Sequence, residues 1–333
     1  MQIKLEISKT FNTQNIVAIK IGGKGEIKFD WGDGTTQKTN LSKDVVSVSY
    51  QYIDNKPRTI IITGTVFYFN CYQSAITHLD FSENSVLQYL ICGYNKLTTL
   101  DVSNNNALIN LECDENRLTN LNVSNMKTLK VLRCNNNQLN KLFTSNSTNL
   151  RELWCFSNKI EILDLNTNID LELINCNGNK LTNLDLNNNL KLTSLQCSYN
   201  PLKILDLKSN TKLIKLIHWG TQLMRLNLRN NLSLTHLECS CNPLKDLDLS
   251  KNIALTYLDC QKNQLTNLDL NKNTKLRTIY CQLNKLQANS LNDMFHTLNN
   301  DGIVIFIAKN PGTSSCEKSI AEKKGWSVNY SYS

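Results

Sequence analysis

The sequence has no long hydrophobic run, because 18 consecutive apolar residues occur nowhere in its 333 residues. This excludes a helix that spans a bilayer, so we expect no membrane insertion. The beginning, MQIKLEISKT, also lacks the basic and then apolar profile of a secretory leader. We therefore expect either a cytoplasmic protein or one whose leader was removed.

The sequence also lacks a block of positive charge. Lys and Arg total 36 against 28 Asp and Glu, a formal net charge of +8, but the basic residues are scattered singly through the chain. The most cationic stretch, residues 317–324, contains two glutamates. Nucleic acids and anionic membranes are bound by Lys and Arg gathered on one face. The excess charge therefore favours solubility, and we expect no nucleic-acid partner.

What the chain does have is a repeat, marked by ten of its twelve cysteines. They share one register with a period of 21 residues, in which His218 takes one place: Cys71, Cys92, Cys113, Cys134, Cys155, Cys176, Cys197, Cys239, Cys260 and Cys281. A chain of 333 residues exceeds the usual limit of a single core, and a fixed period of this length indicates a stack of similar coils.

The repeating unit has the form LxxLxCxxNxLxxLDLSxNxx, as in LINLECDENRLTNLNVSNMKT at residues 108–128. Side chains alternate along a strand, so the LxC part predicts a short strand with Leu and Cys pointing inward. Stacked coils then form a parallel sheet, in which Cys acts as a small hydrophobic residue. We expect reduced, buried thiols, because in-register strands about 4.8 Å apart suit the S–S torsion poorly.

A column of asparagines follows three residues after the cysteines. Its members are Asn95, Asn116, Asn137, Asn158, Asn179, Asn200, Asn242, Asn263 and Asn284, with Ser74 and Thr221 as interruptions. The chain turns inward here, and a buried amide can both donate to and accept from the stranded backbone groups. The second half of the unit predicts an extended or short-strand convex side. Aspartates are expected near its turns, at Asp164, Asp185, Asp206, Asp248 and Asp269.

From about Phe69 to Leu286 the chain resembles bacterial leucine-rich-repeat surface proteins, especially internalin-type proteins with a cysteine ladder in 21-residue repeats. The resemblance implies a leucine-rich-repeat solenoid: a curved rod with a concave parallel β-sheet that recognises a partner, often on a host or neighbouring cell. The coil LIKLIHWGTQLMRL departs from the pattern, since it has neither the Cys nor the Asn. We expect three parts: a β-rich N-terminal cap at 1–68, the solenoid at 69–286 and an α/β C-terminal cap at 287–333.

The N-terminal part reads as alternating strands around FDWGDGT. With SYQY and TIIITG after it, this stretch resembles the β-sandwich domain of the polycystic-kidney-disease (PKD) type, whose WDFGDG hairpin is shortened here to DWGDG. Asp33 followed by Gly34 suits a tight turn. Asp30 and Asp33 offer too few ligands for calcium, so we favour turn chemistry and expect no metal site.

The C-terminal part departs from the repeat after Leu286. SLNDMFHTLNND is amphipathic and predicts a helix with Ser290 as its N-cap, and GIVIFIA predicts a buried strand. CEKSIAEKKGW predicts a last helix that ends at Gly325, with Cys316 packed in the cap. The NPG at residues 310–312 resembles the closing segment of related bacterial repeat proteins.

The outward side chains of the strands would line the concave face. Several are aromatic or apolar, which is typical of binding sites. The predicted partner-binding patch comprises Trp154, Phe156, Leu173, Tyr199, Ile217, Trp219 and Tyr257. An acidic group beside it, Glu112, Asp114, Glu115 and Glu152, offers pairing to a basic partner. The alternatives are that neighbouring side chains cover the rings, and that the acids form a solvated face.

No catalytic motif is present: His78, His218, His236 and His296 lie in neither HExxH nor GxSxG. His218 with Cys197 or Cys239 could form a nucleophile pair or hold zinc. However, burial in the inward column raises a thiol pKa and blocks substrate, and no fourth zinc ligand is evident. We expect no enzyme, no catalytic residue, no cofactor and no metal, with Cys241 as the most reactive thiol.

These observations favour a monomeric protein-recognition module, secreted or at the cell surface of a bacterium, that binds its partner on the concave face. The first alternative is glycan binding, with Trp154, Phe156, Trp219 and Tyr257 stacking on sugar rings. The second is a structural spacer within a longer chain.

Overall fold

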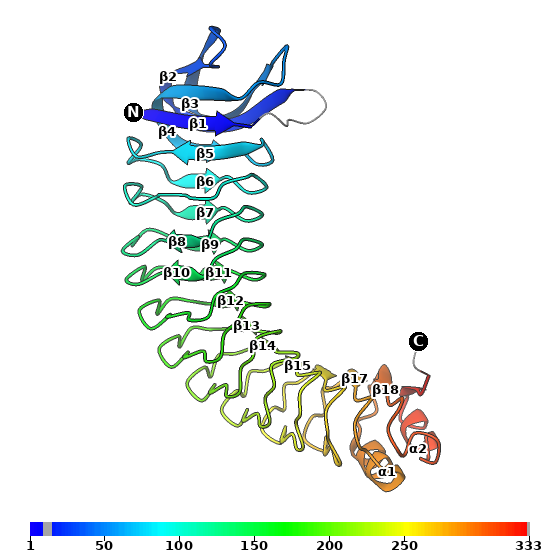
Figure 1. Ribbon diagram of the computed structural model, residues 1–333. Helices are drawn as coiled ribbons and strands as arrows, with labels where there is room; N and C mark the ends of the chain where they lie inside the picture. Colours follow the sequence, from blue (N-terminus) through cyan, green and yellow to red (C-terminus); the bar gives the residue numbers. More distant parts are fainter. Residues whose placement is uncertain (9–14, 332–333) are drawn as a thin grey trace. The chain divides into compact units, whose positions relative to one another are not determined.

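The computed structural model describes residues 1–8 and 15–331, in two compact units: Met1–Asn168 and Ile169–Ser333. In the first unit an antiparallel sheet leads into a stack of coils (Figure 1). In the second unit the stack of coils leads into two short helices and two further strands.

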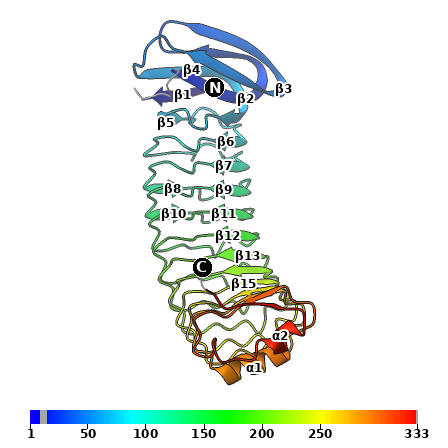
Figure 2. The same ribbon diagram turned by 90° about the vertical axis from the view of Figure 1, so that its right-hand side faces the viewer.

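The antiparallel sheet has the strand order β3-β2-β4-β1-β5. Its strands are β1 (Gln2–Ile7), β2 (Ile16–Asp30), β3 (Thr36–Gln51), β4 (Arg58–Asn70) and β5 (Ile76–Asp80). In β1 every second side chain is buried, namely Ile3, Leu5 and Ile7, as expected of a strand with one face on a core. The end of β4 pairs in parallel with β6 (Tyr89–Ile91), so the sheet covers the first coil (Figure 2).

The FDWGDGT stretch forms the turn between β2 and β3. The Asp30 carboxylate accepts from the Gly32 N–H at 3.0 Å, and Asp33 accepts from the Thr35 N–H at 3.0 Å and from the Tyr50 hydroxyl at 2.8 Å. Both carboxylates therefore take part in turn hydrogen bonds, as the turn interpretation predicts. Nothing confirms the resemblance to a PKD-type domain, which stays a prediction.

The coils of the first unit stack in register, each contributing one three-residue strand to a parallel sheet. After β6 come β7 (Asn110–Glu112), β9 (Val131–Arg133) and β11 (Glu152–Trp154), and residues 21 apart are partners. Two coils of this unit also pair on their other side, through β8 (Asn120–Asn122) and β10 (Lys141–Phe143). This second side, the predicted convex side, is called the back face below, and the outward side of the parallel strands is called the sheet face.

The second unit shows the same pattern of parallel three-residue strands. Its strands are β12 (Leu173–Asn175), β13 (Ser194–Gln196), β14 (Lys215–Ile217), β15 (His236–Glu238), β16 (Tyr257–Asp259) and β17 (Thr278–Tyr280). The cap adds α1 (Ala288–Thr297), β18 (Val304–Phe306), α2 (Ser319–Glu322) and β19 (Ser327–Asn329). The back face of the coils described in this unit is extended chain and turns, without strands.

The cysteine column is fully buried, and every cysteine of the chain is a free thiol. Burial raises the pKa of the Cys176 and Cys281 thiols to about 12, because an apolar environment disfavours the thiolate. The prediction of an inward ladder of buried cysteines is confirmed.

The asparagine column binds successive coils together, as Asn200 illustrates. Its Nδ2 donates to the carbonyls of Cys176 at 3.0 Å, Cys197 at 3.1 Å and Ser198 at 3.2 Å, and its Oδ1 accepts from the Leu181 N–H at 3.0 Å. One side chain therefore satisfies four backbone groups in two coils.

A second asparagine ladder lies behind the first, near the turns of the back face. The Asn231 Nδ2 donates to the carbonyls of Leu207 at 3.1 Å and Asn210 at 2.9 Å, and the Asn252 Nδ2 repeats this bonding one coil later. These side chains are fully buried. The same asparagine stands in the consensus of the repeat, but the sequence pattern alone did not indicate this role. The aspartates of the back face accept from the N–H two residues later, as in Asp248 to Ser250 at 3.0 Å, which agrees with the turn prediction.

The cap differs from the prediction in two places. Helix α1 begins at Ala288 after Gln287, and Gln287 makes no side-chain cap bond, so the prediction of Ser290 as N-cap was wrong. The last helix has only four residues. Asn310 of the NPG stretch extends the ladder, because its Nδ2 donates to Cys281 O at 3.0 Å and to Ile307 O at 2.8 Å.

Candidate recognition surface

The sheet face is built from the two strand residues that flank each buried leucine or isoleucine, and from the turn that follows the cysteine. The residue two positions after each ladder cysteine, and after His218, has a positive φ between 52° and 61°. Residues other than glycine adopt this backbone conformation at a cost in free energy. Contacts between the stacked coils, and not the local preference of the residue, therefore stabilise the turn. It directs Tyr94, Tyr199 and Cys241 to solvent.

In the first unit, Trp154 and Phe156 flank Cys155 on one coil, and both are half-buried. The Arg133 guanidinium, on the paired strand β9, lies over the Trp154 ring at 5.5 Å from its centroid. The Trp154 indole N–H donates to Glu152 at 3.4 Å. One ring face is therefore covered by a cation, which reduces the apolar surface that this tryptophan offers.

The predicted acidic group lies in the same unit. Glu112 and Asp114 flank Cys113, and Glu112 is opposite Arg133 in the strand pairing. Burial raises the pKa of Asp114, with smaller contributions from the charges of Glu112 and Glu115, whereas Arg133 lowers it. The carboxylates therefore repel one another in a partly desolvated position, which favours binding of a positive charge there.

Two exposed tyrosines of this unit were not singled out from the sequence. Tyr72 is 46% and Tyr94 is 50% exposed, and their ring centroids are 5.5 Å apart. Asp114 and Glu115 are close enough to raise the pKa of Tyr72, after desolvation as the main cause. The register of the repeat could have indicated both tyrosines, because Tyr72 follows a ladder cysteine directly and Tyr94 has the same place in its coil as Tyr199.

In the second unit, Tyr199 and Trp219 meet on neighbouring coils. Their ring centroids are 5.8 Å apart with the planes at 64°, an edge-to-face contact. Tyr199 is 61% exposed and Trp219 is half-buried. The Ser198 hydroxyl accepts from the Trp219 N–H at 3.0 Å, so the backbone that carries the indole is fixed.

Leu173 and Ile217 differ from each other in exposure. Leu173 is half-buried, but Ile217 is only 8% exposed. Its outward position on β14, between Gln196 and Glu238 of the paired strands, was predicted correctly, but its exposure was not. Ile217 therefore supports the surface from below and offers little contact area.

Tyr257 belongs to a stack of rings along the sheet face. It lies parallel to His236 at 4.3 Å between centroids and contacts Tyr280 at 5.8 Å, and Tyr280 stacks on Phe306 at 4.4 Å. His236 also bonds to the Glu238 carboxylate at 2.7 Å, which lowers the pKa of Glu238. The His236 ring covers one face of Tyr257, which reduces the ring surface that Tyr257 offers to a sugar.

The residues that were considered for catalysis or zinc lie in the interior. His218 is completely buried, its ring contacts Thr221 at 3.3 Å, and burial lowers its pKa to about 4. Burial raises the pKa of Cys197 and Cys239 far above the ordinary value. Within residues 1–8 and 15–331, no three His, Cys, Asp or Glu side chains gather as metal ligands would. These three side chains are therefore core residues.

The predicted patch is divided between the two compact units. Trp154 and Phe156, with the acidic group, lie in the first; Leu173, Tyr199, Ile217, Trp219 and Tyr257 lie in the second. In-register short strands, a buried cysteine column and buried asparagines between coils define a leucine-rich-repeat solenoid. Solenoids of this class are interaction scaffolds, because stacking creates extended binding surfaces.

Several solved structures are similar to this chain. An internalin, InlF from Listeria monocytogenes, is 18% identical over 80% of this chain and 87% of its own, with a TM-score of 0.64. YopM, a leucine-rich effector protein from Yersinia pestis, is 26% identical over 64% of this chain and 60% of its own, with a TM-score of 0.53. The internalin-like repeat fold is thus shown.

The functional domain of InlJ from Listeria monocytogenes, which includes a cysteine ladder, is 28% identical over 73% of this chain and 74% of its own, with a TM-score of 0.39. No family model and no curated protein matches the chain. Throughout the described ranges, every helix is too short or too polar to cross a membrane.

Proposed function

We propose that the chain is a protein-recognition module of a bacterial surface or secreted protein, and that it binds its partner as a monomer through the sheet face. The observation that carries the proposal is the Tyr199–Trp219 pair: two large rings in edge-to-face contact, one of them 61% exposed, on a backbone fixed by the ladder. Rigid aromatic side chains lose little entropy on binding, and Trp and Tyr dominate the energetics of protein interfaces.

The first unit carries a second group of candidate contact residues on its own sheet face. Trp154 and Phe156 are half-buried beside Glu152, and the carboxylates of Glu112 and Asp114 lie on the same sheet face. Aromatic anchors with charged groups around them are the usual composition of a specific interface. We also propose the division into an N-terminal cap at 1–68, a solenoid at 69–286 and a C-terminal cap at 287–333.

Two double variants test the proposal: Tyr199→Ala with Trp219→Ala, and Trp154→Ala with Phe156→Ala. Leu232→Ala is the matched control, because Leu232 is 56% exposed and lies outside the sheet face. Each protein is used for capture from host-cell surface extract and on a glycan array. The expected result is a protein captured by wild type and control, and at least tenfold less by either double variant, at unchanged melting temperature.

The alternatives give different results. A glycan signal that both double variants abolish would replace the protein partner by a sugar. Capture that is equal in all variants would remove the sheet face as the binding surface and favour a structural spacer. Loss of the folding transition in the variants would show that the rings belong to the core.

A further inference from the structure

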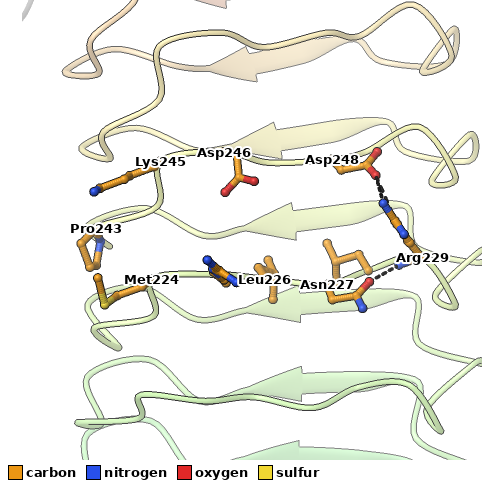
Figure 3. Close-up of a pocket in the computed structure, with 10 residues that line it drawn as sticks. Met224, Leu226, Asn227, Arg229, Pro243, Lys245, Asp246 and Asp248 are labelled. Carbon is orange, nitrogen blue, oxygen red and sulfur yellow. Dashed lines mark hydrogen bonds and ion pairs between the residues drawn. The ribbon is translucent and has the colours of Figure 1, made fainter.

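A groove on the back face of the second unit has no part in the proposed sheet-face surface. It has a volume of about 650 Å³ and lies between the chain segments 224–229 and 243–248 of two neighbouring coils (Figure 3). A second hollow of about 740 Å³ adjoins it on the preceding coil, and the two share Met224, Arg225 and Asn227. Together they are called the back groove.

At the groove one backbone bond between the neighbouring coils is missing. In the two following coils a backbone bond joins neighbours at this level: Gln264 N donates to Leu244 O at 2.8 Å, and Lys285 N donates to Leu265 O at 2.9 Å. The residue that would donate to Leu223 O is Pro243, which has no N–H. This one backbone bond is therefore missing between the two coils, and Pro243 lies at one end of the groove (Figure 3).

Apolar side chains extend from the groove into solvent. Ile204 is 72% and Met224 is 62% exposed, and both line the shared hollow from neighbouring coils. Contact of adjacent large aliphatic side chains with water is unfavourable. An apolar group of a ligand that covers them would remove this cost. Methionine adapts its shape to different partners.

The charge of the groove is mainly positive. Five cations line it, Lys203, Lys208, Arg225, Arg229 and Lys245, against three carboxylates, Asp206, Asp246 and Asp248. Two carboxylates are neutralised, since Lys208 pairs with Asp206 at 3.1 Å and Arg229 with Asp248 at 3.3 Å. Within the described part of the chain, Lys203, Arg225 and Lys245 have no ion pair, so the groove offers three cations around two exposed apolar side chains.

We propose that the back groove binds an acidic, extended segment of a partner protein. An apolar side chain of that segment packs between Ile204 and Met224, and its carboxylates pair with Lys203, Arg225 and Lys245. The fork of an arginine binds a carboxylate with two hydrogen bonds, which suits this assignment. The groove's own carboxylates would repel a uniformly charged polyanion, whereas a segment with separated charges can avoid them.

The probe is a short fluorescein-labelled synthetic peptide in which glutamate and leucine alternate, titrated with the intact chain and followed by fluorescence anisotropy. We expect saturable binding that weakens as salt is added, because exposed charge pairs are screened. Arg225→Glu with Lys245→Glu should weaken the binding at least tenfold, and Met224→Ser with Ile204→Ser at least threefold. Lys212→Glu with Lys251→Glu makes the same charge change on exposed residues outside the groove and should leave the affinity within twofold.

The outcomes that overturn the proposal are distinct. A peptide with lysine in place of glutamate that binds equally would remove the charge selectivity. A polyglutamate peptide that binds equally would remove the apolar contact. Concentration-dependent dimerisation lost in Arg225→Glu with Lys245→Glu would assign the groove to a second copy of the chain. Tyr199→Ala with Trp219→Ala should not change peptide affinity, so failure here is distinguishable from failure of the sheet-face proposal.

Discussion

Asn242 and His218 occupy neighbouring coils, and the Asn242 Nδ2 donates to the His218 carbonyl at 2.9 Å. The asparagine ladder therefore crosses the coil in which both pattern residues are replaced. The Asn242 Oδ1 accepts from the Thr221 hydroxyl at 2.9 Å and from the Thr221 N–H at 3.0 Å. The asparagine of the following coil therefore provides the hydrogen-bond acceptor for both donors of Thr221. His218 takes the cysteine's place inside the core, where it is held uncharged.

The pH dependence of stability should reveal this histidine. Its pKa is about 4 in the folded chain against the ordinary 6.5, so between these values the unfolded chain binds a proton that the folded chain does not. The free energy of unfolding contributed by His218 is therefore fully present above pH 6.5 and decreases as the pH falls towards 4, by about 3 kcal/mol in total. Urea unfolding followed by circular dichroism, from pH 7 to pH 4, measures it.

His218→Cys is the matched variant, because it restores the ladder residue. Its free energy of unfolding should decrease less over the same pH range. If wild type and variant lose stability in parallel between pH 6.5 and 4, the buried neutral histidine is not the cause.

The asparagine ladder should contribute strongly to stability. Asn200→Ala removes four hydrogen bonds and leaves buried backbone groups without partners, which should cost about 3 kcal/mol. Asn267→Ala is the control, because Asn267 is exposed on the back face, and it should change the free energy of unfolding by less than about 0.5 kcal/mol. Equal effects in urea unfolding would mean that the ladder asparagine is dispensable.

Thiol reactivity should separate the cysteines by position. In the folded protein Ellman's reagent should react fast with Cys241, which is exposed, and more slowly with Cys316, which is half-buried with a pKa raised by desolvation. The ten ladder thiols should react only after unfolding, since they are fully buried. Cys241→Ser should abolish the fast phase; a fast phase that survives this change would place a reactive thiol elsewhere.

The cap should be sensitive at Gly302. A Cβ there would lie 1.7 Å from the Trp326 ring, which is 2% exposed and donates its indole N–H to Asn299 O at 2.9 Å. Gly302→Ala must displace this ring, so we expect a loss of about 2 kcal/mol from overpacking and faster hydrogen exchange in residues 298–329. Asp301→Ala, a change of the exposed neighbour, is the control. Unchanged exchange in Gly302→Ala would show that the ring can move at no cost.

The period, the cysteine column and the first asparagine column could be predicted from the sequence, because each coil repeats the same local environment. A residue type that recurs every 21 positions in a stack reports directly on burial or hydrogen bonding. The turn role of Asp248 followed from the same logic. Ser290 was misjudged as a cap because a serine before an apolar pattern is a local signal, whereas α1 begins where the chain leaves the last coil.

The sequence by itself therefore determined the coil, its strand and the inward residues, since these depend on alternation and period within 21 positions. Only the tertiary structure decided how far each outward side chain is covered. Ile217 is buried and Tyr257 is stacked on His236, whereas Tyr199 stays exposed, and these differences depend on side chains of other coils. The back groove also needed the structure, because side chains of neighbouring coils line it and their exposure cannot be read from the sequence.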